Sequence, residues 1–547
     1  MPTLRLALAQ INSTVGDIDG NADKILNFAK RARAVKADIV IFPELAITGY
    51  PPEDLLLKPK FISDNLKALK KIEQKVGDMA VVAGFVDQEK GSLYNAAAFI
   101  HLGKTRAVCH KTILPNYGVF DEKRYFTEGK ALPVFTFNGA RIGLGVCEDI
   151  WHKGGPASRQ IKGGKTDIII NINSSPYHAG KLNDRLSVIK DRLKEGKANI
   201  VYVNMVGGQD ELIFDGGSLV VDKKGSVVAM GKQFEEDLVL VDIPLPKDGK
   251  KLLELKPPIK RFCFEPLSPE EEVYRALTLA VRDYVGKNGF KKVLIGISGG
   301  VDSAITAVIA SDAIGKENVN CVFMPSEFTS ERSREDALAL VKNLGINIVD
   351  LPINRILEAY LFDLSSEFKG LEKDIAEENL QARIRGNLLM ALSNKFGWLV
   401  LTTGNKSEMS VGYATLYGDM AGGYAVLKDI PKTLVYRLSN WRNKKGAVIP
   451  QSIIDREPTA ELKPNQKDQD VLPLYDVLDP IIDHYVVDNM DYKHIVRKGF
   501  PADTVKKVIK MIDHAEYKRR QSPPGPKITH RAFGKDWRLP ITNLYKG

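Results

Sequence analysis

A cysteine that directly follows an apolar run is the first residue in this sequence that could perform covalent chemistry. Residues 141–146 predict a strand, and Cys147 comes next, ahead of Glu148 and Asp149. A cysteine on a sharp turn after a strand can attack a carbonyl carbon, while backbone N–H groups of the turn stabilise the oxyanion. The alternative is a small buried side chain, which is the commoner role of a lone cysteine.

Two charged residues end other predicted strands. Glu44 ends the run 39–44, and Lys111 follows a strand region that ends near His110. Alone, each could be a surface charge or a salt-bridge partner. Together with Cys147 they make a base, a cation and a nucleophile. Because the acidic neighbours of Cys147 disfavour a thiolate, we expect Glu44 to remove the thiol proton during attack.

A glycine-rich segment in the second half predicts a phosphate-binding loop. Residues 295–303 read Ile-Gly-Ile-Ser-Gly-Gly-Val-Asp-Ser and join a predicted strand, 293–297, to a predicted helix, 304–310. Small residues let backbone N–H groups approach a phosphate at the N-terminus of a helix, where the helix dipole also favours an anion. The segment lacks the lysine of a Walker A loop.

The first 245 residues alternate between strand-like and helix-like patterns that could position the cysteine, the glutamate and the lysine. Helical periodicity occurs at 21–35 and 183–194. Strands are predicted at 4–9, 38–42, 80–86, 95–101, 141–146, 167–173, 200–205, 218–221 and 238–243.

The chain then divides into two predicted domains, 1–245 and 268–547. Residues 246–267, rich in lysine and proline and without periodicity, predict a linker. Ser268 and the following Pro-Glu-Glu open a new helix as an N-cap and first turn. Strands and helices alternate from there, with further strands at 319–323 and 398–401 and a long helix at 375–396. This order predicts an α/β domain with a doubly wound parallel sheet, whose ligands bind beyond the carboxyl ends of the strands.

Composition narrows the class of protein. The 547 residues are 44% hydrophobic and 27% charged, as in ordinary globular proteins. The start lacks the pattern of a secretory signal, the apolar runs are too short for a bilayer, and four cysteines make no disulfide framework. We therefore predict a cytoplasmic protein without a membrane partner.

The net charge of +10 is partly concentrated near the C-terminus, where residues 516–546 hold eight Lys/Arg against two Asp/Glu. A solvated face and the binding of an anionic phosphate substrate both explain this segment. No zinc-finger spacing or aromatic–basic signature indicates a nucleic acid as a partner.

The motifs of the first half, Phe42-Pro43-Glu44, His110-Lys111-Thr112 and Cys147-Glu148-Asp149, resemble those of the nitrilase/amidase superfamily over residues 1–245. The resemblance implies a four-layer α-β-β-α sandwich. It also implies that Glu44 is the general base, that Lys111 supports the tetrahedral intermediate and that Cys147 forms a thioester with the glutamyl group.

The Ser-Gly-Gly-x-Asp-Ser loop resembles that of the ATP pyrophosphatases, which cleave ATP between the α- and β-phosphates. Further motifs at 378–385, 401–408, 417–419 and 517–519 are similar to those of NAD synthetases. Taken singly, Arg383 and Arg385 could lie on a solvated helix face, and Glu408 could be a helix cap. With the first half, the whole chain resembles the glutamine-dependent NAD synthetases.

That resemblance implies a ligase that amidates deamido-NAD with ammonia from L-glutamine, uses ATP as co-substrate and Mg²⁺ as cofactor, and forms a homo-oligomer. Its site residues are as follows. Implied glutamine contacts are Tyr117, Ser175 and Lys181, with Ser174 left open as an alternative to Ser175; implied ATP contacts are Gly296, Ile297, Ser298, Gly299, Gly300, Val301, Asp302, Ser303 and Thr403; implied deamido-NAD contacts are Asn379, Glu408 and Lys518; implied Mg²⁺ ligands are Asp302 and Glu408.

Two other functions remain as alternatives. One is an amidotransferase for another acceptor, such as a purine nucleotide or an acidic amino acid. Those enzymes usually carry a Cys-His-Glu triad or an N-terminal cysteine, and this sequence shows neither arrangement. The other is a scaffold that binds ligands without turnover.

Overall fold

The computed structural model of this chain describes residues 3–164, 166–245, 259, 263 and 265–545. Its contacts divide the chain into two compact units. Unit 1 comprises Met1–Gln209 and Ile213–Leu267, and unit 2 comprises Asp210–Leu212 and Ser268–Gly547. Most of the predicted linker, 246–267, lies outside the described residues, so the predicted domain boundaries stay a prediction.

Unit 1 contains two six-stranded sheets and a short two-stranded one. The first sheet has the order β14-β1-β2-β3-β4-β5, and the second has the order β13-β12-β9-β8-β7-β6. The strands are β1 (Thr3–Gln10), β2 (Ile39–Ile41), β3 (Ala80–Glu89), β4 (Ser92–His101), β5 (Lys104–His110), β6 (Val134–Phe137), β7 (Ala140–Val146), β8 (Ile168–Asn173), β9 (Asn199–Asn204), β10 (Val206–Gln209), β11 (Leu212–Asp215), β12 (Leu219–Val221), β13 (Val227–Met230) and β14 (Asp237–Pro244).

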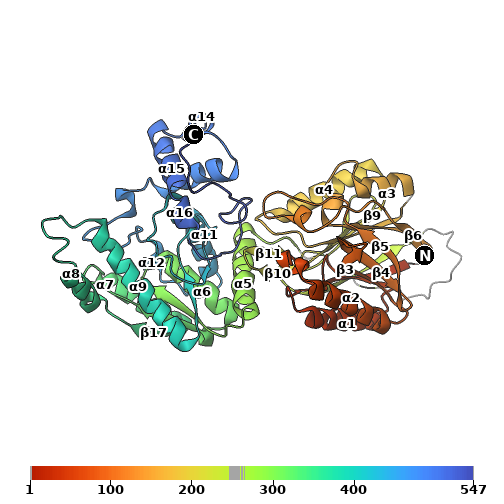
Figure 1. Cartoon of the computed structure of the whole chain (residues 1–547), viewed down its shortest axis with the longest axis horizontal. Helices are drawn as coiled ribbons and strands as arrows, with labels where there is room; N and C mark the ends of the chain where they lie inside the picture. The colour runs from red at the N-terminus through yellow and green to blue at the C-terminus, as the bar shows by residue number, and fades with distance from the viewer. Residues whose placement is uncertain (1–2, 165, 246–258, 260–262, 264, 546–547) are drawn as a thin grey trace. The chain divides into compact units, whose positions relative to one another are not determined.

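Helices cover the outer faces of both large sheets of unit 1 (Figure 1). Alternate residues of β1, such as Leu6 and Leu8, pack against the inner face of the second sheet, and Ala7 and Ala9 pack under the helices of the first. The helices are α1 (Ile18–Ala34) and α2 (Pro59–Lys75) on the first sheet and α3 (Pro156–Gly164) and α4 (Lys181–Glu195) on the second. The predicted four-layer α-β-β-α sandwich is confirmed.

Unit 2 is built on a five-stranded parallel sheet with the order β17-β16-β15-β18-β19. The strands are β15 (Val293–Ile297), β16 (Val319–Phe323), β17 (Asn347–Asp350), β18 (Leu399–Thr402) and β19 (Tyr424–Ala425). The chain runs outward from β15 to β17 and then crosses to the other side of β15. This reversal of strand order creates a switch point, where loops from two neighbouring strands diverge and leave room for a ligand. The predicted doubly wound sheet is confirmed.

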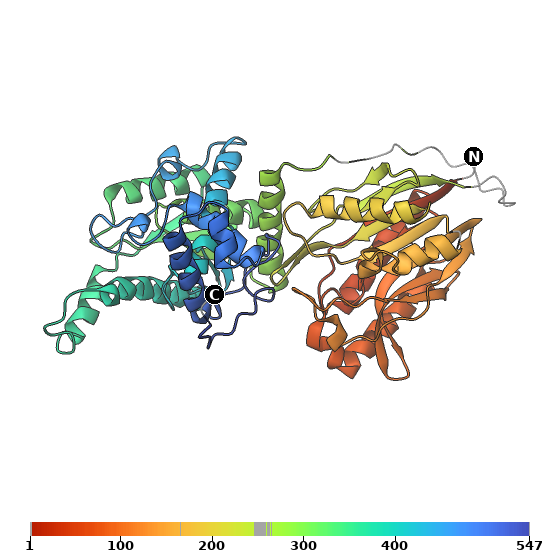
Figure 2. The ribbon, with the colours of Figure 1, turned by 90° about the horizontal axis from the view of Figure 1, so that it is seen from above.

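Helices surround the sheet of unit 2, and α9 lies towards the viewer in Figure 1 and at the edge of the unit in Figure 2. They are α5 (Pro269–Lys287), α6 (Val301–Ile314), α7 (Glu331–Leu344), α8 (Asn354–Asp363), α9 (Ile375–Phe396), α10 (Lys406–Val411), α11 (Lys432–Asn443), α12 (Gln451–Ile454), α13 (Tyr475–Ile482), α14 (Tyr492–Arg497), α15 (Ala502–His514) and α16 (Glu516–Arg519). Among the helices of the described ranges, none is long and apolar enough to cross a bilayer.

Candidate active sites

Cys147 stands on a strained turn at the end of β7. Its φ of +44° lies in the left-handed region, which is uncommon for a residue with a side chain and persists only where the surroundings enforce it. Two buried groups do so here. The Asp149 carboxylate accepts a hydrogen bond from the Val146 N–H at 3.1 Å, and the Asn171 amide donates to the Cys147 carbonyl at 3.2 Å. The predicted turn is therefore present and held from both sides.

Glu44 and Lys111 lie in the same buried centre and are both 0% exposed, so the surface-charge interpretation is wrong for each. The Lys111 ammonium donates to Glu44 Oε1 at 2.8 Å. The same oxygen accepts a hydrogen bond from the Asn95 amide at 2.7 Å, and Oε2 accepts one from the Ser174 N–H at 2.7 Å. Three donors thus hold the Glu44 carboxylate in one orientation.

A second glutamate, which the sequence reasoning missed, completes the surroundings of Lys111. Glu122 Oε1 accepts hydrogen bonds from the Lys111 ammonium and from the Tyr50 hydroxyl, both at 2.8 Å. Glu122 opens a short 3₁₀ turn and follows no predicted strand, so hydrophobic periodicity could not reveal it. The sequence offers one hint that Glu122 belongs to this centre, which is that it lies only eleven residues from Lys111.

The charges of this centre keep the thiol protonated at rest. Burial and the neighbouring Glu44 carboxylate raise the pKa of Cys147 well above its ordinary value. Burial raises the pKa of Glu122 to about 7. Burial lowers the pKa of Lys111, but the nearby Glu122 and Glu44 carboxylates outweigh it and raise that pKa overall. A neutral thiol beside a carboxylate requires a base to accept its proton during attack.

Two of the three predicted glutamine contacts, Tyr117 and Lys181, lie near this centre within unit 1. The Tyr117 hydroxyl donates to Glu148 at 3.0 Å, and the Lys181 ammonium lies over the Trp151 ring at 4.3 Å. A charge on Cys147 influences the pKa values of both Tyr117 and Lys181, which places them within electrostatic range of the sulfur. Burial is the main influence on the Lys181 pKa and lowers it.

Ser174 and Ser175 follow β8 and are both buried. The Ser174 hydroxyl donates to the Glu44 carbonyl at 2.9 Å, so it already supports the base. The Ser175 N–H donates to the Asn204 side chain at 3.0 Å. Ser175 as the glutamine contact stays a prediction.

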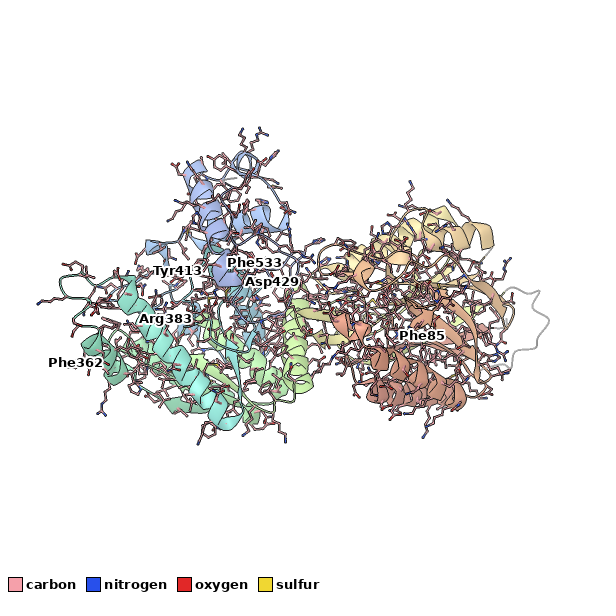
Figure 3. All side chains as sticks on the ribbon, in the orientation of Figure 1. Phe85, Phe362, Arg383, Tyr413, Asp429 and Phe533 are labelled. Carbon is pink, nitrogen blue, oxygen red and sulfur yellow. The ribbon has the colours of Figure 1, made fainter. Side chains whose placement is uncertain are left out.

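Unit 2 contains a cavity of about 640 Å³ whose wall includes the glycine loop. Arg383 and Tyr413, labelled in Figure 3, belong to the same wall. The cavity brings together Gly296, Ile297, Ser298, Gly300, Val301, Asp302, Ser303, Asn379, Thr403, Glu408 and Lys518. These residues come from the ends of β15 and β18, from α6, α9 and α10, and from the C-terminal segment, as expected for a site beyond the carboxyl ends of parallel strands.

Gly299 is the one predicted ATP contact that does not line this wall among the described residues. Its φ is +79°, and a Cβ at this position would meet the Ser333 carbonyl oxygen at 2.5 Å. Only glycine therefore fits between the loop and the start of α7. The loop is further ordered by Ser303, whose hydroxyl accepts a hydrogen bond from the Ser298 N–H at 3.2 Å.

Asp302 and Glu408 face each other across a lysine that the sequence reasoning missed. The Lys432 ammonium is hydrogen-bonded to Asp302 Oδ2 and lies 3.8 Å from Glu408 Oε1. Burial and the charge of Asp302 raise the pKa of Glu408 to about 8. Carboxylate oxygens are donors that Mg²⁺ prefers, and Asp302 and Glu408 both line the cavity, so the residues fit the implied ion.

Glu408 also caps α10, because its carboxylate accepts a hydrogen bond from the Asn405 N–H at 3.2 Å. The helix-cap interpretation of Glu408 is therefore correct, but it does not exclude the other, since the same side chain lines the cavity. The solvated-face interpretation holds only partly for the two arginines. Arg383 is exposed, whereas Arg385 is largely buried, donates to the Met324 carbonyl at 2.9 Å and has its pKa lowered by burial to about 10.

Asn379 and Lys518 are hydrogen-bonded to the segment between α10 and β19, which contributes residues to the wall of the cavity. Asn379 accepts a hydrogen bond from the Thr415 hydroxyl at 2.8 Å. The Lys518 ammonium donates to the carbonyls of Gly412 and Ala414, each at 2.9 Å. Burial lowers the pKa of Lys518. Asn379 and Lys518 thus line the cavity together with Glu408, the third predicted deamido-NAD contact.

Comparison with known proteins gives a family to each half of the chain. Residues 5–248 match the carbon–nitrogen hydrolase family, and residues 273–522 match the NAD synthase family. The chain is 48% identical to a glutamine-dependent NAD(+) synthetase of Thermotoga maritima over 100% of both chains. It is 47% identical to one of Aquifex aeolicus over 99% of this chain and 100% of the relative.

Solved structures agree. The glutamine-dependent NAD+ synthetase of Acinetobacter baumannii in complex with adenosine diphosphate is 44% identical, covers 99% of each chain and superposes with a TM-score of 0.78. A glutamine-dependent NAD(+) synthetase of Cytophaga hutchinsonii, 22% identical, has the same fold, with a TM-score of 0.84 over 99% of this chain and 98% of that one.

Unit 1 is a carbon–nitrogen hydrolase sandwich with a buried Cys–Glu–Lys centre, and unit 2 is an NAD synthase domain built on a parallel sheet. Together in one chain they define an amidotransferase of the ligase class. Identities above 40% along the full length make the membership specific. The chain belongs to the glutamine-dependent NAD(+) synthetases.

Proposed function

We propose that this chain amidates deamido-NAD to NAD, with ammonia released from L-glutamine in unit 1 and ATP consumed in unit 2. The other products are AMP, diphosphate and glutamate. A carboxylate is a poor electrophile with a poor leaving group, so its conversion to an amide requires activation by ATP. Membership of the glutamine-dependent NAD(+) synthetases supports this reaction over transfer to a purine nucleotide or an acidic amino acid.

In unit 1, the Cys147 sulfur attacks the side-chain amide carbon of glutamine while Glu44 accepts the thiol proton. Glu44 then returns this proton to the amide nitrogen, the C–N bond breaks, and ammonia leaves a glutamyl thioester. Water, deprotonated by Glu44, attacks the thioester, and the proton returns to the sulfur as glutamate forms. The short Glu44–Lys111 contact, 2.8 Å, supports a role of Lys111 beside the negative charge of the tetrahedral intermediates.

In unit 2, the nicotinate carboxylate of deamido-NAD attacks the α-phosphorus of ATP and displaces diphosphate. Ammonia then attacks the carbonyl carbon of this adenylate, and AMP leaves with the bonding electrons. We assign the contacts of ATP to residues 296–303 and Thr403, and those of deamido-NAD to Asn379, Glu408 and Lys518. Asp302 and Glu408 would hold Mg²⁺, which would supply positive charge beside the diphosphate. The position of both carboxylates on the cavity wall, together with residues of the glycine loop, supports their choice as ligands.

The proposal also covers the two domains, the glutamine contacts, and the location and assembly of the chain. Residues 1–245 form the glutaminase domain, and residues 268–547 form the synthetase domain. Glutamine is held by Tyr117, Ser175 and Lys181. The chain acts in the cytoplasm as a homo-oligomer, with small-molecule substrates only.

One observation carries the assignment of the first half-reaction: a buried thiol, a carboxylate with three donors and an ammonium converge within unit 1. The test is to incubate the chain with deamido-NAD, ATP, Mg²⁺ and glutamine. We expect NAD and AMP in equal amounts, together with glutamate. Amidation of xanthylate or aspartate in place of deamido-NAD, or absence of AMP release, would contradict the proposal.

A further inference from the structure

A closed ring of buried hydrogen bonds surrounds the peptide of Ser175. The Ser175 N–H donates to Asn204 Oδ1 at 3.0 Å, and the Ser175 carbonyl accepts from Arg185 Nη2 at 3.2 Å. Arg185 also grips both oxygens of Asp215, at 2.7 and 2.6 Å. The Asn204 amide closes the ring by donating to Asp215 Oδ1 at 3.4 Å.

The ring draws on four segments of unit 1 and is shielded from solvent. Ser175 follows β8, Asn204 ends β9, Asp215 ends β11, and Arg185 lies on α4. Ser175 is 4% exposed and the other three residues are 0% exposed. A planar guanidinium that binds a carboxylate with two parallel hydrogen bonds fixes direction as well as distance, which a lysine cannot do. The proposed reaction steps use neither Arg185 nor Asp215.

Arg185 connects two of the residues assigned to glutamine. Lys181 is the first residue of α4, and Arg185 follows it by about one helical turn. The connection from Ser175 to Lys181 includes Gly180 with a φ of +81°, so the chain reverses sharply between them. Arg185 thus ties the Ser175 carbonyl to the first turns of the helix that begins at Lys181.

We propose that Arg185, oriented by Asp215, is a positioning residue that sets the spacing of the Ser175 and Lys181 contacts and thereby the affinity for glutamine. The proposal rests on the assignment of these two residues to glutamine in the proposed function. It assigns Arg185 no contact with substrate.

The first test is Arg185→Lys, which keeps the charge but loses the fork. We expect the KM for glutamine to rise by roughly 10- to 100-fold, the penalty typical of a misplaced substrate contact. NAD formation from ammonium should stay within about two-fold, because it uses unit 2. Alkylation of Cys147 by iodoacetamide, followed by mass spectrometry of its peptide, should also stay within about two-fold, since this small probe needs neither Ser175 nor Lys181.

A matched control is available in the same unit. Arg5 is 3% exposed and grips Asp242 with two hydrogen bonds at 2.8 and 2.9 Å, between β1 and β14. Arg5→Lys therefore disturbs a similar fork, on an aspartate that is 20% exposed, which touches none of the assigned residues, and it should leave the KM for glutamine unchanged. A second variant, Arg185→Met with Asp215→Leu, removes both charges at once, which avoids an unpaired buried charge and still deprives the Ser175 carbonyl of its donor.

The outcomes separate this inference from the function on which it rests. If Ser175→Ala and Lys181→Ala leave the KM for glutamine unchanged, the assignment of the contacts is wrong. If those two raise it but neither Arg185 variant does, the positioning role is wrong. A fall in kcat and in Cys147 alkylation at constant KM overturns it as well, and so does failure of both Arg185 variants to fold while Arg5→Lys folds, since the ring is then structural.

Discussion

Replacing Cys147 with alanine should separate the two half-reactions. The thiol is the proposed site of covalent attack, and neither Glu44 nor Lys111 can form a thioester in its place. Synthesis of NAD from glutamine should therefore stop, whereas synthesis fed by high external ammonium should continue. The phosphate-binding loop, 296–303, belongs to the other unit, so the substitution does not touch it.

The structure sets the size of both effects. Loss of a catalytic nucleophile should lower the glutamine-dependent rate by at least about 10³-fold, or about 4 kcal/mol in the activation barrier. The cost to folding is smaller. Alanine lacks only the sulfur of a side chain packed among the residues between the two sheets, and it adopts the +44° turn no less easily than cysteine, so unfolding should become easier by about 1–3 kcal/mol at most.

The assay compares NAD formation from glutamine and from ammonium in the wild type and in Cys147→Ala, with thermal unfolding of both proteins. The ammonium-dependent rate should remain within about two-fold of wild type. A purely structural cysteine predicts another result, in which both nitrogen sources fail in parallel and the melting temperature falls. That result, or full retention of glutamine use, would refute the assignment of the nucleophile.

Four further substitutions test other parts of the two sites. Glu44→Gln should lower glutamine-dependent synthesis by about 10²- to 10⁴-fold, the usual contribution of a general base, and leave the ammonium-dependent rate intact; equal loss of both rates would contradict it. Burial raises the pKa of Glu122 to about 7, so this residue binds its proton more tightly in the folded state than in the unfolded chain. The stability that the bound proton contributes, on the order of 3 kcal/mol at full strength, is present at pH 4 and is lost as the pH rises through 7. Melting temperatures measured from pH 5 to 8 should therefore fall less in Glu122→Gln than in wild type, and parallel curves would refute this. Asp302→Ala should abolish NAD formation from either nitrogen source while glutamine hydrolysis survives at least in part, and near-normal synthesis at saturating Mg²⁺ would remove Asp302 from the loop assignment. Lys518→Ala should raise the KM for deamido-NAD more than that for ATP, measured with the other substrate fixed, and an unchanged KM would return Lys518 to a structural role.

Strong periodicity made most of the supporting elements predictable. The predicted helix at 21–35 corresponds to α1 (Ile18–Ala34), and the predicted strand at 238–243 lies within β14 (Asp237–Pro244). Other elements were missed, among them β6 (Val134–Phe137) and the helices that follow β19. Two of these helices, α12 and α16, have only four residues each, too few to show a helical period, and contacts elsewhere in unit 2 hold them.

The residues of the two sites also divide into those that the sequence predicted and those that it missed. Each predicted member of the centre in unit 1 stands at or just past a strand end, where a run of apolar residues stops at a residue able to do chemistry. Glu122 and Lys432 have no such marker. Both were found only because folding places their charges against residues already suspected, at 2.8 Å from Lys111 and in contact with Asp302.

Sequence alone determined the types of chemistry available to this chain and its alternation of strands and helices, because motif spacing and apolar periodicity are local properties. The four-layer sandwich followed only from the family resemblance. Sequence alone could not determine whether Glu44 and Lys111 were surface charges or a buried pair, since burial depends on which segments fold over them. The same holds for Arg185, whose partners Ser175 and Asp215 lie 10 and 30 residues away along the chain, and for Asn204, which is hydrogen-bonded to both of them. Only the tertiary structure brings them into one ring, because a hydrogen bond between distant segments requires the strands and helices that carry them to pack first.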